Sequence, residues 1–177
     1  MKKLLVAAAI LLSIAACAVI IFNVSSGKNV DITDQSEWEY VSHDEFTAKL
    51  PSAMESSSKL YSTSSGSAQI ACYTYDDIVF SVAKKAIPAD QLKSLNLKEY
   101  IQNTTINGER LVPVKLTNGY YYKTTNNSNE RYQMEALFKG KNAVYSVTAG
   151  CPMDESAEYE ESMIAWLKQQ INPQTRT

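Results

Sequence analysis

The sequence RYQMEALFKGKNAVYSVTA, residues 131–149, contains two alternating apolar and polar segments that are separated by a short turn. Alternation with a period of two is typical of β-strands with one buried face. The turn Gly140-Lys141-Asn142 joins the two segments, so we expect an antiparallel hairpin. In its first strand the apolar positions are Tyr132, Met134, Ala136 and Phe138. This hairpin predicts a fold that is built on an antiparallel sheet.

Similar strand signals occur upstream of this hairpin. Asn118-Gly119 is a strong hairpin-turn signal, and Asp76-Asp77 predicts a second tight turn. Pro113 cannot donate to a ladder and therefore places its strand at a sheet edge. The expected strands are residues 38–41, 46–50, 69–75, 78–87, 111–116 and 120–124, and residues 62–67 are expected to form a loop.

Two helices are expected in the same part of the chain. The first begins after Asn96, which can cap it while Glu99 reaches back, although it could also start earlier, near Asp90. The second covers residues 156–171, where apolar and amphipathic residues recur with helical spacing on one face. These residues are Tyr159, Met163, Trp166, Leu167 and Gln170. The sequence therefore predicts an α+β fold with a central antiparallel sheet of about six strands and helices packed against it.

Residues 4–24, LLVAAAILLSIAACAVIIFNV, carry no charge and follow Lys2 and Lys3. As a helix this stretch reaches roughly 30 Å, which is one hydrocarbon core. The two lysines would stay on the cytoplasmic side, so the rest of the chain would lie outside. We therefore expect an N-terminal membrane helix in residues 1–24, a linker in residues 25–37, an extracytoplasmic domain in residues 38–171 and a tail in residues 172–177.

Two other interpretations of this stretch remain open. Ile14-Ala15-Ala16-Cys17 resembles a bacterial lipoprotein signal, in which Cys17 would be acylated and become the mature N-terminus. The chain stays apolar after Cys17, up to Asn23, which favours an uncleaved anchor instead. A cleaved secretory signal is the third interpretation, but a small-residue cleavage site is missing before residue 25.

The charge of the chain after residue 24 limits its partners. All 19 acidic residues and 15 of the 17 basic residues lie there, which gives a net charge of −4. Nucleic-acid binding requires a basic surface, so we expect no nucleic-acid partner. A polybasic contact with anionic lipid is disfavoured for the same reason.

The order of elements resembles the Mog1/PsbP-like fold, whose members include bacterial surface lipoproteins of unknown function. The resemblance rests on FTAKLP at residues 46–51, a helix at 97–101, Gly119-Tyr120-Tyr121, the strand pair of residues 131–149 and the closing helix with Trp166. It implies a central antiparallel sheet with helices against it. Named members of this fold bind a small GTPase or a photosynthetic complex, but no motif in this chain matches those sites. The resemblance therefore assigns no functional residue.

The sequence offers little for catalysis or metal binding. His43 is the only histidine, and with Asp44 it would be the minimum set for a hydrolase whose site assembles only in the folded chain. Asp154, Glu155 and Glu158 could bind calcium, but we favour their interaction with a helix N-terminus. We expect no catalytic, cofactor or metal site.

Tyr120, Tyr121 and Tyr122 are consecutive, so they cannot all face the interior from one strand. Together with residues 126–129 they are our candidate contact surface. The alternative, which we favour, is that a helix covers one face of this strand and solvent reaches the hydroxyl groups on the other.

Cys72 and Cys151 are the only cysteines after residue 24. An oxidising location permits a disulfide between them, and closing a loop of about 80 residues would stabilise the fold by roughly 4 kcal/mol. We expect this disulfide, with two buried thiols as the alternative.

These observations favour a non-enzymatic, membrane-anchored extracytoplasmic domain that binds a protein or an envelope component. The alternatives are an extracytoplasmic hydrolase without a sequence motif and a carrier of a small ligand or lipid. A carrier would require a sizeable apolar cavity between the sheet and a helix.

Overall fold

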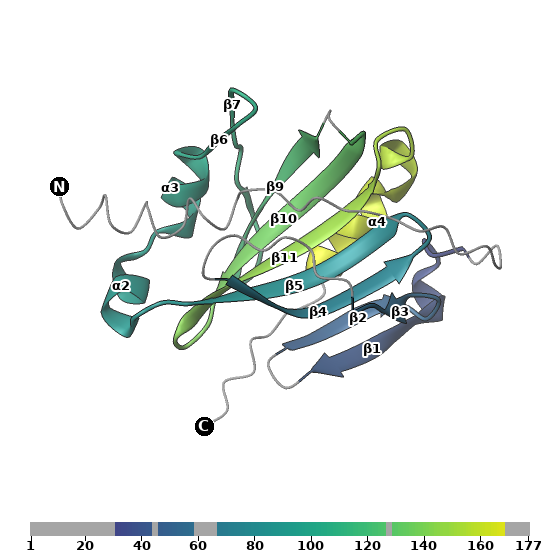
Figure 1. Ribbon diagram of the computed structural model, residues 1–177, viewed down its shortest axis with the longest axis horizontal. Helices are drawn as coiled ribbons and strands as arrows, with labels where there is room; N and C mark the ends of the chain where they lie inside the picture. Colours follow the sequence, from purple (N-terminus) through teal and green to yellow (C-terminus); the bar gives the residue numbers. More distant parts are fainter. Residues whose placement is uncertain (1–30, 44–45, 59–66, 127–128, 169–177) are drawn as a thin grey trace.

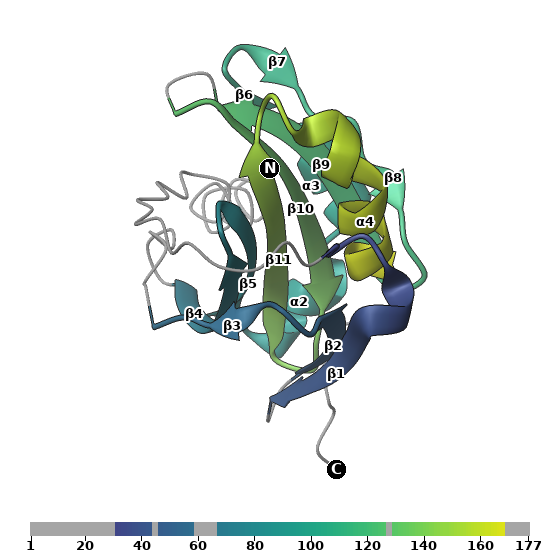
Figure 2. The same ribbon diagram turned by 90° about the vertical axis from the view of Figure 1, so that its right-hand side faces the viewer.

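The computed structural model describes residues 31–43, 46–58, 67–126 and 129–168. The central sheet has seven antiparallel strands in the order β3-β4-β5-β11-β10-β9-β8, one more than the six expected (Figures 1 and 2). The strands of this sheet are β3 (Glu55–Ser56), β4 (Ser67–Tyr75), β5 (Ile78–Ala86), β8 (Val114–Lys115), β9 (Gly119–Asn126), β10 (Arg131–Lys139) and β11 (Ala143–Pro152). The predicted hairpin of residues 131–149 forms its centre as β10 and β11.

The two N-terminal strands form a sheet of their own. β1 (Trp38–His43) and β2 (Phe46–Pro51) pair only with each other in the described chain. The 3-10 helix η1 (Gln35–Glu37) precedes β1, and Asp34 caps it. Ile32 is buried, and its carbonyl accepts a hydrogen bond from Trp38 Nε1 at 3.0 Å. The expected linker of residues 25–37 is therefore wrong at its C-terminal end, because the domain already includes Ile32.

One face of the sheet is covered by α4 (Ser156–Lys168) and by the β1–β2 hairpin (Figure 2). Met163, Trp166 and Leu167 of α4 are fully buried there, as the helical stripe predicts. The rings of Trp166 and Trp38 lie 5.9 Å apart, which joins the helix to the N-terminal hairpin. The expected end of this helix, residues 169–171, lies outside the described residues.

The opposite face of the sheet carries the second core, beneath α2 (Ala89–Ser94) and α3 (Leu97–Gln102). Asn96 caps α3 as expected, since its side chain accepts from the Glu99 amide at 3.2 Å. The earlier start near Asp90 proves to be a separate helix, because Leu95 is extended. After α3, the two-stranded hairpin of β6 (Thr105–Ile106) and β7 (Glu109–Arg110) leads to the sheet edge.

The turns between strands depend on both their local sequence and contacts with distant residues. Asp76 joins β4 to β5 in the left-handed region, with φ of 47°. Arg131 is buried at the start of β10 and donates from Nη2 to the Asp77 carbonyl, which ties this turn to the sheet. Asn118-Gly119 marks the β8–β9 hairpin as predicted, and β8 is an edge strand after Pro113.

The expected disulfide between Cys72 and Cys151 is not present, and both residues are buried thiols. Cys72 lies on β4 and Cys151 on β11, with β5 between them. Two strand spacings already separate their backbones by about 9.6 Å, beyond the roughly 7 Å that a disulfide allows. The two thiols also point to opposite faces of the sheet. Cys72 pairs with Ser81 of β5 and shares its face. Cys151 lies on the same face as Ala149, whose partner on β5 is Phe80, and the neighbours Phe80 and Ser81 face opposite sides.

We expect Cys72 and Cys151 both to be labelled when the protein is unfolded without reductant and treated with a thiol reagent. In the folded protein labelling should be slow, because both residues are at most 2% exposed and burial raises the pKa of Cys151 to about 11. Mass spectrometry of the labelled protein measures both states. A protein that takes up no label at Cys72 and Cys151 until it is reduced would contradict this arrangement.

The described helices include none that is both long and apolar enough to cross a membrane. The expected anchor in residues 1–24, with Cys17, and the expected tail in residues 172–177 lie outside the described residues.

Candidate functional site

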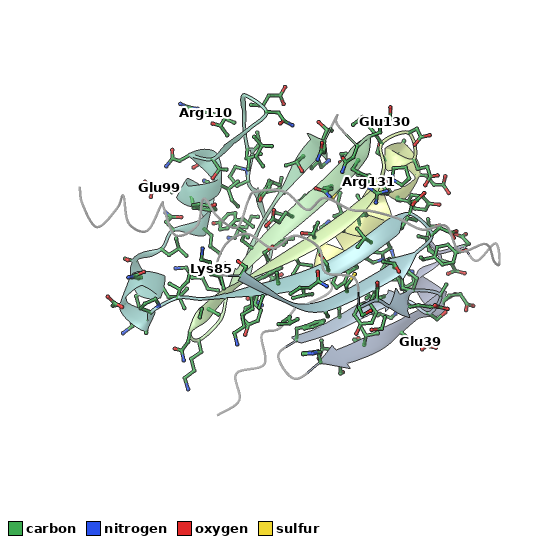
Figure 3. All side chains as sticks on the ribbon, in the orientation of Figure 1. Glu39, Lys85, Glu99, Arg110, Glu130 and Arg131 are labelled. Carbon is green, nitrogen blue, oxygen red and sulfur yellow. The ribbon has the colours of Figure 1, made fainter. Side chains whose placement is uncertain are left out.

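A groove of about 460 Å³ lies at the edge of the central sheet, beside β9. One wall is the segment from the β6–β7 hairpin to β8, and the other is the C-terminal half of β9. Figure 3 places Arg110 on the hairpin arm, which stands away from the sheet. The residues that line the groove are Ile106, Asn107, Glu109, Arg110, Leu111, Val112, Val114, Lys123, Thr124 and Thr125.

The hairpin wall follows from local sequence. Asn107 and Gly108 both have positive φ, 52° and 84°, which is the geometry that an Asn-Gly turn adopts between two paired strands. Beyond the hairpin, Leu111 is buried in the second core and its amide donates to the Thr104 carbonyl at 3.2 Å. Leu111 therefore anchors a segment whose next residues are held out toward solvent.

Two apolar side chains stay exposed on this wall. Val112 is 75% exposed and Val114 is 40% exposed. In the described residues only one other large apolar side chain is exposed, Tyr40 on β1. Exposed apolar groups that gather at a groove are typical of interaction sites.

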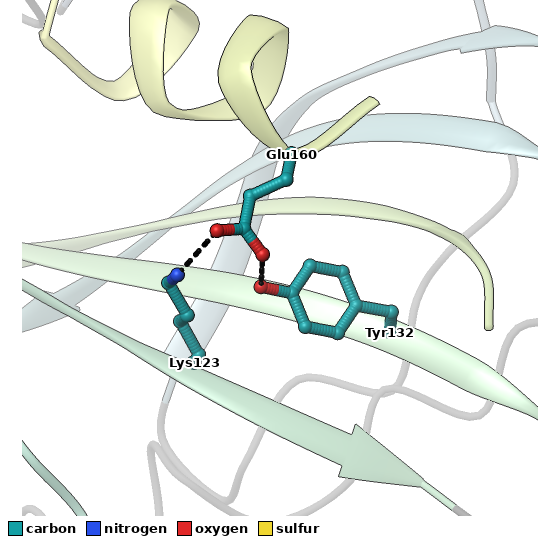
Figure 4. A network of polar contacts seen from close by, with 3 residues as sticks. All are labelled: Lys123, Tyr132 and Glu160. Atoms are coloured by element: carbon teal, nitrogen blue, oxygen red, sulfur yellow. Dashed lines mark hydrogen bonds and ion pairs between the residues drawn. The ribbon is translucent and has the colours of Figure 1, made fainter. Parts of the chain in front are cut away.

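The β9 wall is held in place by α4 (Figure 4). The Lys123 ammonium group forms a 2.6 Å ion pair with Glu160 Oε1, and the Tyr132 hydroxyl donates to Glu160 Oε2 at 2.5 Å. These contacts lower the pKa of the Glu160 carboxyl, while burial and the Glu160 hydrogen bond raise the pKa of Tyr132. Both Lys123 and Glu160 remain partly exposed, so the pair contributes at most about 1 kcal/mol. Its main effect is to fix where the Lys123 side chain points.

A polar cluster on the face of α2 and α3 is a second feature of the sheet. The Glu135 carboxylate accepts from the Tyr122 hydroxyl at 2.5 Å and from the Ser146 hydroxyl at 2.8 Å. Burial raises the pKa of Glu135, although both hydrogen bonds oppose this shift. Burial also raises the pKa of Tyr122 well above its ordinary value. Since β9, β10 and β11 each supply one member, the cluster fixes the registers of these strands.

The pKa of Glu135 predicts a pH-dependent stability. Because the pKa is raised in the folded state, the folded protein holds its proton more tightly than the unfolded chain does. The contribution of Glu135 to the free energy of unfolding is fully present below pH 4.5, the ordinary pKa of a glutamate. It is lost as the pH rises through the higher pKa of the folded protein. We therefore expect Glu135→Gln to reduce the fall in unfolding free energy between pH 4.5 and 8. Urea unfolding at several pH values measures this slope.

Glu160→Gln is the matched control for this measurement. The pKa of Glu160 is lowered, so its contribution is present above pH 4.5 and is lost as pH falls through the folded pKa. Glu160→Gln should therefore leave the slope between pH 4.5 and 8 unchanged and alter it only below pH 4.5, where wild-type stability rises with pH. Equal slopes in wild type and Glu135→Gln would show that Glu135 is not desolvated in the folded protein.

The predicted tyrosine surface is corrected by the structure. Tyr121 is 5% exposed and Tyr122 is 1% exposed, and they point into the two different cores. Tyr120 is half-buried against the second core. The alternation along the strand was predicted correctly, but helices on both faces cover the rings. The accessible part of this strand begins just after them, at Lys123.

The other candidate residues for catalysis or metal binding form no site among the described residues. His43 is exposed at the end of β1, stacks on Phe46 at 5.4 Å and does not line the groove. Asp44 and Cys17 lie outside the described residues. Within residues 31–43, 46–58, 67–126 and 129–168, no three histidine, cysteine or acidic side chains are arranged to hold a metal ion. Asp154, Glu155 and Glu158 are included in that search.

The residues of the hairpin wall were missed by sequence reasoning. A signal was present, because Val112 precedes Pro113 at the predicted sheet edge, where apolar side chains have no neighbouring strand to cover them. The sequence could not show that the Asn107-Gly108 turn lies beside β9. That position depends on the hydrogen bond from Asn107 to the Thr125 carbonyl, and these two residues are 18 positions apart.

Comparison with solved structures defines the class of fold. The solution structure of cyanobacterial PsbP (CyanoP) from Synechocystis sp. PCC 6803 matches 83% of this chain and 98% of that chain, with a TM-score of 0.54 and 12% sequence identity. The chain therefore has a PsbP-like fold, as the order of its elements predicted. At this identity the likeness shows the fold alone.

A second solved structure has a weaker likeness to this chain. It is a crystal structure from Bacteroides thetaiotaomicron VPI-5482, with a TM-score of 0.42, 15% identity and coverage of 68% of this chain and 43% of that chain. No protein-family profile matches the chain, and no curated protein matches it.

Proposed function

We propose that this protein is a non-enzymatic, membrane-tethered extracytoplasmic domain that binds a protein partner through the groove beside β9. The observation that carries the proposal is the distribution of exposed apolar side chains. Two of the three large ones in the described residues, Val112 and Val114, lie on the rim of this groove. Exposing them to water costs free energy that a partner would recover by covering them.

The position of the groove supports the same function. It lies at the sheet edge, whereas the space between the sheet and α4 is filled by Met163, Trp166 and Leu167, which are at most 1% exposed. A groove at a sheet edge suits an extended segment that adds to the sheet. The carrier alternative, which needs a cavity between sheet and helix, gains no support from this packing.

The tether is proposed from the sequence of residues 4–24. Lys2 and Lys3 before an uncharged stretch of this length favour a single-pass helix with the domain outside the cytoplasm. Intact-mass measurement of the protein from native membranes separates the two kinds of tether. Retention of Lys2 and Lys3 supports the helix, and an acylated N-terminus at Cys17 would replace it with a lipid anchor.

Site-specific photocrosslinking tests the binding site. A photoreactive amino acid is placed at Val112 of the full-length protein in its native membrane, and the same amino acid at Tyr40 is the matched control. Tyr40 is equally exposed, at 74%, but lies on β1 and not on the groove. We expect a discrete adduct at position 112 that is absent at position 40. No adduct at 112, or the same adducts at both positions, would contradict binding through the groove.

A further inference from the structure

Strand β9 has an open backbone edge within the groove. β8 is only two residues long, and its Val114 and Lys115 pair with Tyr121 and Tyr120. β9 continues to Asn126, whereas its other side is paired with β10 along nearly its whole length. The sheet therefore lacks a described neighbour strand beside residues 123–125, where β9 lines the groove.

The direction of the backbone groups follows from the hydrogen bonds of the hairpin. The Leu116 amide donates to the Gly119 carbonyl at 2.9 Å, so the polar groups of Gly119 face β8. Backbone groups alternate in direction along an antiparallel strand, which turns those of Lys123 and Thr125 to the same outer side. The side-chain amide of Asn107 confirms this direction, because it donates to the Thr125 carbonyl at 3.1 Å.

Asn107 thus occupies the position that the amide of a neighbouring strand would take. It satisfies the Thr125 carbonyl. Within the described part of the chain, three outward backbone groups then face the groove, which are the Lys123 N–H, the Lys123 C=O and the Thr125 N–H. This set is the hydrogen-bonding pattern of a strand edge that is ready to accept another strand.

We propose that the groove binds an extended acidic peptide segment, which adds to β9 as an eighth strand of the central sheet and ends at Asn107. This inference rests on the proposed function and specifies the kind of partner that the same groove takes. Backbone hydrogen bonds to Lys123 and Thr125 hold the segment, and its alternate side chains contact Val112 and Val114.

The edge is accessible to such a segment. Lysine side chains often protect an edge strand by obstructing a second strand. Here the Lys123 ammonium group is held by Glu160 of α4, so the lysine points along the sheet face and away from the edge. Both Lys123 and Thr125 are exposed.

The charges around the groove favour an acidic segment. Arg110 and Glu109 line it with opposite charges, and the charge of Lys123 is already paired with Glu160. Lys115, exposed on β8 next to Val114, therefore leaves a net positive charge around the groove. Opposite charge across an interface directs the choice of partner more than it raises affinity, so we expect a preference and not an absolute requirement.

A synthetic seven-residue peptide that alternates valine with glutamate is the first probe, and its counterpart with lysine in place of glutamate is the control. Amide exchange of the full-length protein in detergent micelles is followed by NMR. We expect the acidic peptide to protect the amides of Lys123 and Thr125 and to leave Thr124 unchanged, because Thr124 already faces β10. The lysine peptide should bind several-fold more weakly. No protection at Lys123 and Thr125, or equal binding of the two peptides, would overturn the proposal.

Thr125→Pro provides the second test. Proline removes an amide that faces the groove and not the β9–β10 ladder, so the fold should survive, and circular dichroism verifies this. Thr125→Val keeps the amide and is the matched control. We expect Thr125→Pro to weaken peptide binding about tenfold, and Thr125→Val to leave it within about twofold.

The same two variants separate this inference from the proposed function. In the photocrosslinking experiment at position 112, Thr125→Pro should abolish the adduct and Thr125→Val should retain it. An adduct that persists in Thr125→Pro shows that the partner uses the groove without strand addition. No adduct in the parent protein, together with peptide-dependent protection of Lys123 and Thr125, would show strand addition without the proposed partner.

Discussion

Replacing Trp166 with alanine is expected to lower the free energy of unfolding by about 4 kcal/mol, which is a large part of the stability of a domain of this size. Trp166 is 1% exposed and joins the central sheet, α4 and the N-terminal hairpin in one core. Its ring lies 5.9 Å from the ring of Trp38. The alanine variant would leave a cavity that three separate elements must close together, so the surrounding structure can relax only in part.

Trp166→Phe and Tyr40→Ala are the controls for this prediction. The Trp166 indole N–H has no hydrogen-bond partner among the described residues, so phenylalanine loses packing but no hydrogen bond and should cost less than half as much. Tyr40 is 74% exposed, and its replacement should change stability by at most about 0.5 kcal/mol. Urea unfolding followed by circular dichroism measures all three. A cost below about 1.5 kcal/mol for Trp166→Ala would show that α4 is not part of the cooperative core.

Gly119→Ala is expected to destabilise the protein by about 3 kcal/mol or more. A Cβ atom at this position would lie 2.2 Å from the Leu137 carbonyl oxygen and 2.9 Å from the Phe138 ring. The first of these atoms is backbone at the centre of the sheet, so it cannot move aside without disturbing the β9–β10 ladder. Thermal unfolding of the variant measures the cost.

Gly108→Ala separates this steric effect from backbone strain. Gly108 has a φ of +84°, but nothing lies within 4 Å of the Cβ that alanine would add. Its replacement should therefore cost only the roughly 1 kcal/mol of a left-handed alanine. Equal losses for the two variants would mean that Gly119 is required for its conformation and not for close approach.

These two glycines show where a sequence pattern is informative and where it is incomplete. Asn107-Gly108 forms a turn with positive φ at both residues, which is the conformation that this dipeptide favours. Asn118-Gly119 also marks a hairpin, yet its glycine is the first residue of β9 and is needed because β10 approaches it closely. The prediction of the hairpin is confirmed. The reason why residue 119 must be glycine, however, is its contact with Leu137 of β10, which lies 18 residues further along the chain.

The candidate site illustrates the same limit. Alternation along residues 120–122 correctly divided the three tyrosines between two faces, but it could not show that helices cover both faces. The groove instead arises where the short strand β8 ends and the β6–β7 hairpin stands beside β9. No local pattern encodes this, because it depends on how far one strand extends along another.

The sequence by itself determined most of the elements of this protein and the buried face of most of those, although it did not predict the short strands β3, β6 and β7. Periodicity, the Asn96 cap and the turn residues act through neighbours within a few positions, so they can be read without the folded chain. Only the tertiary structure decided the strand order, which places β5 between the two cysteines, and the separation of β1 and β2 into their own sheet. The open edge of β9 is likewise a feature that only the tertiary structure decided. Such features depend on contacts between distant residues, where many pairings satisfy the same alternation and only the packing of the complete core selects one of them.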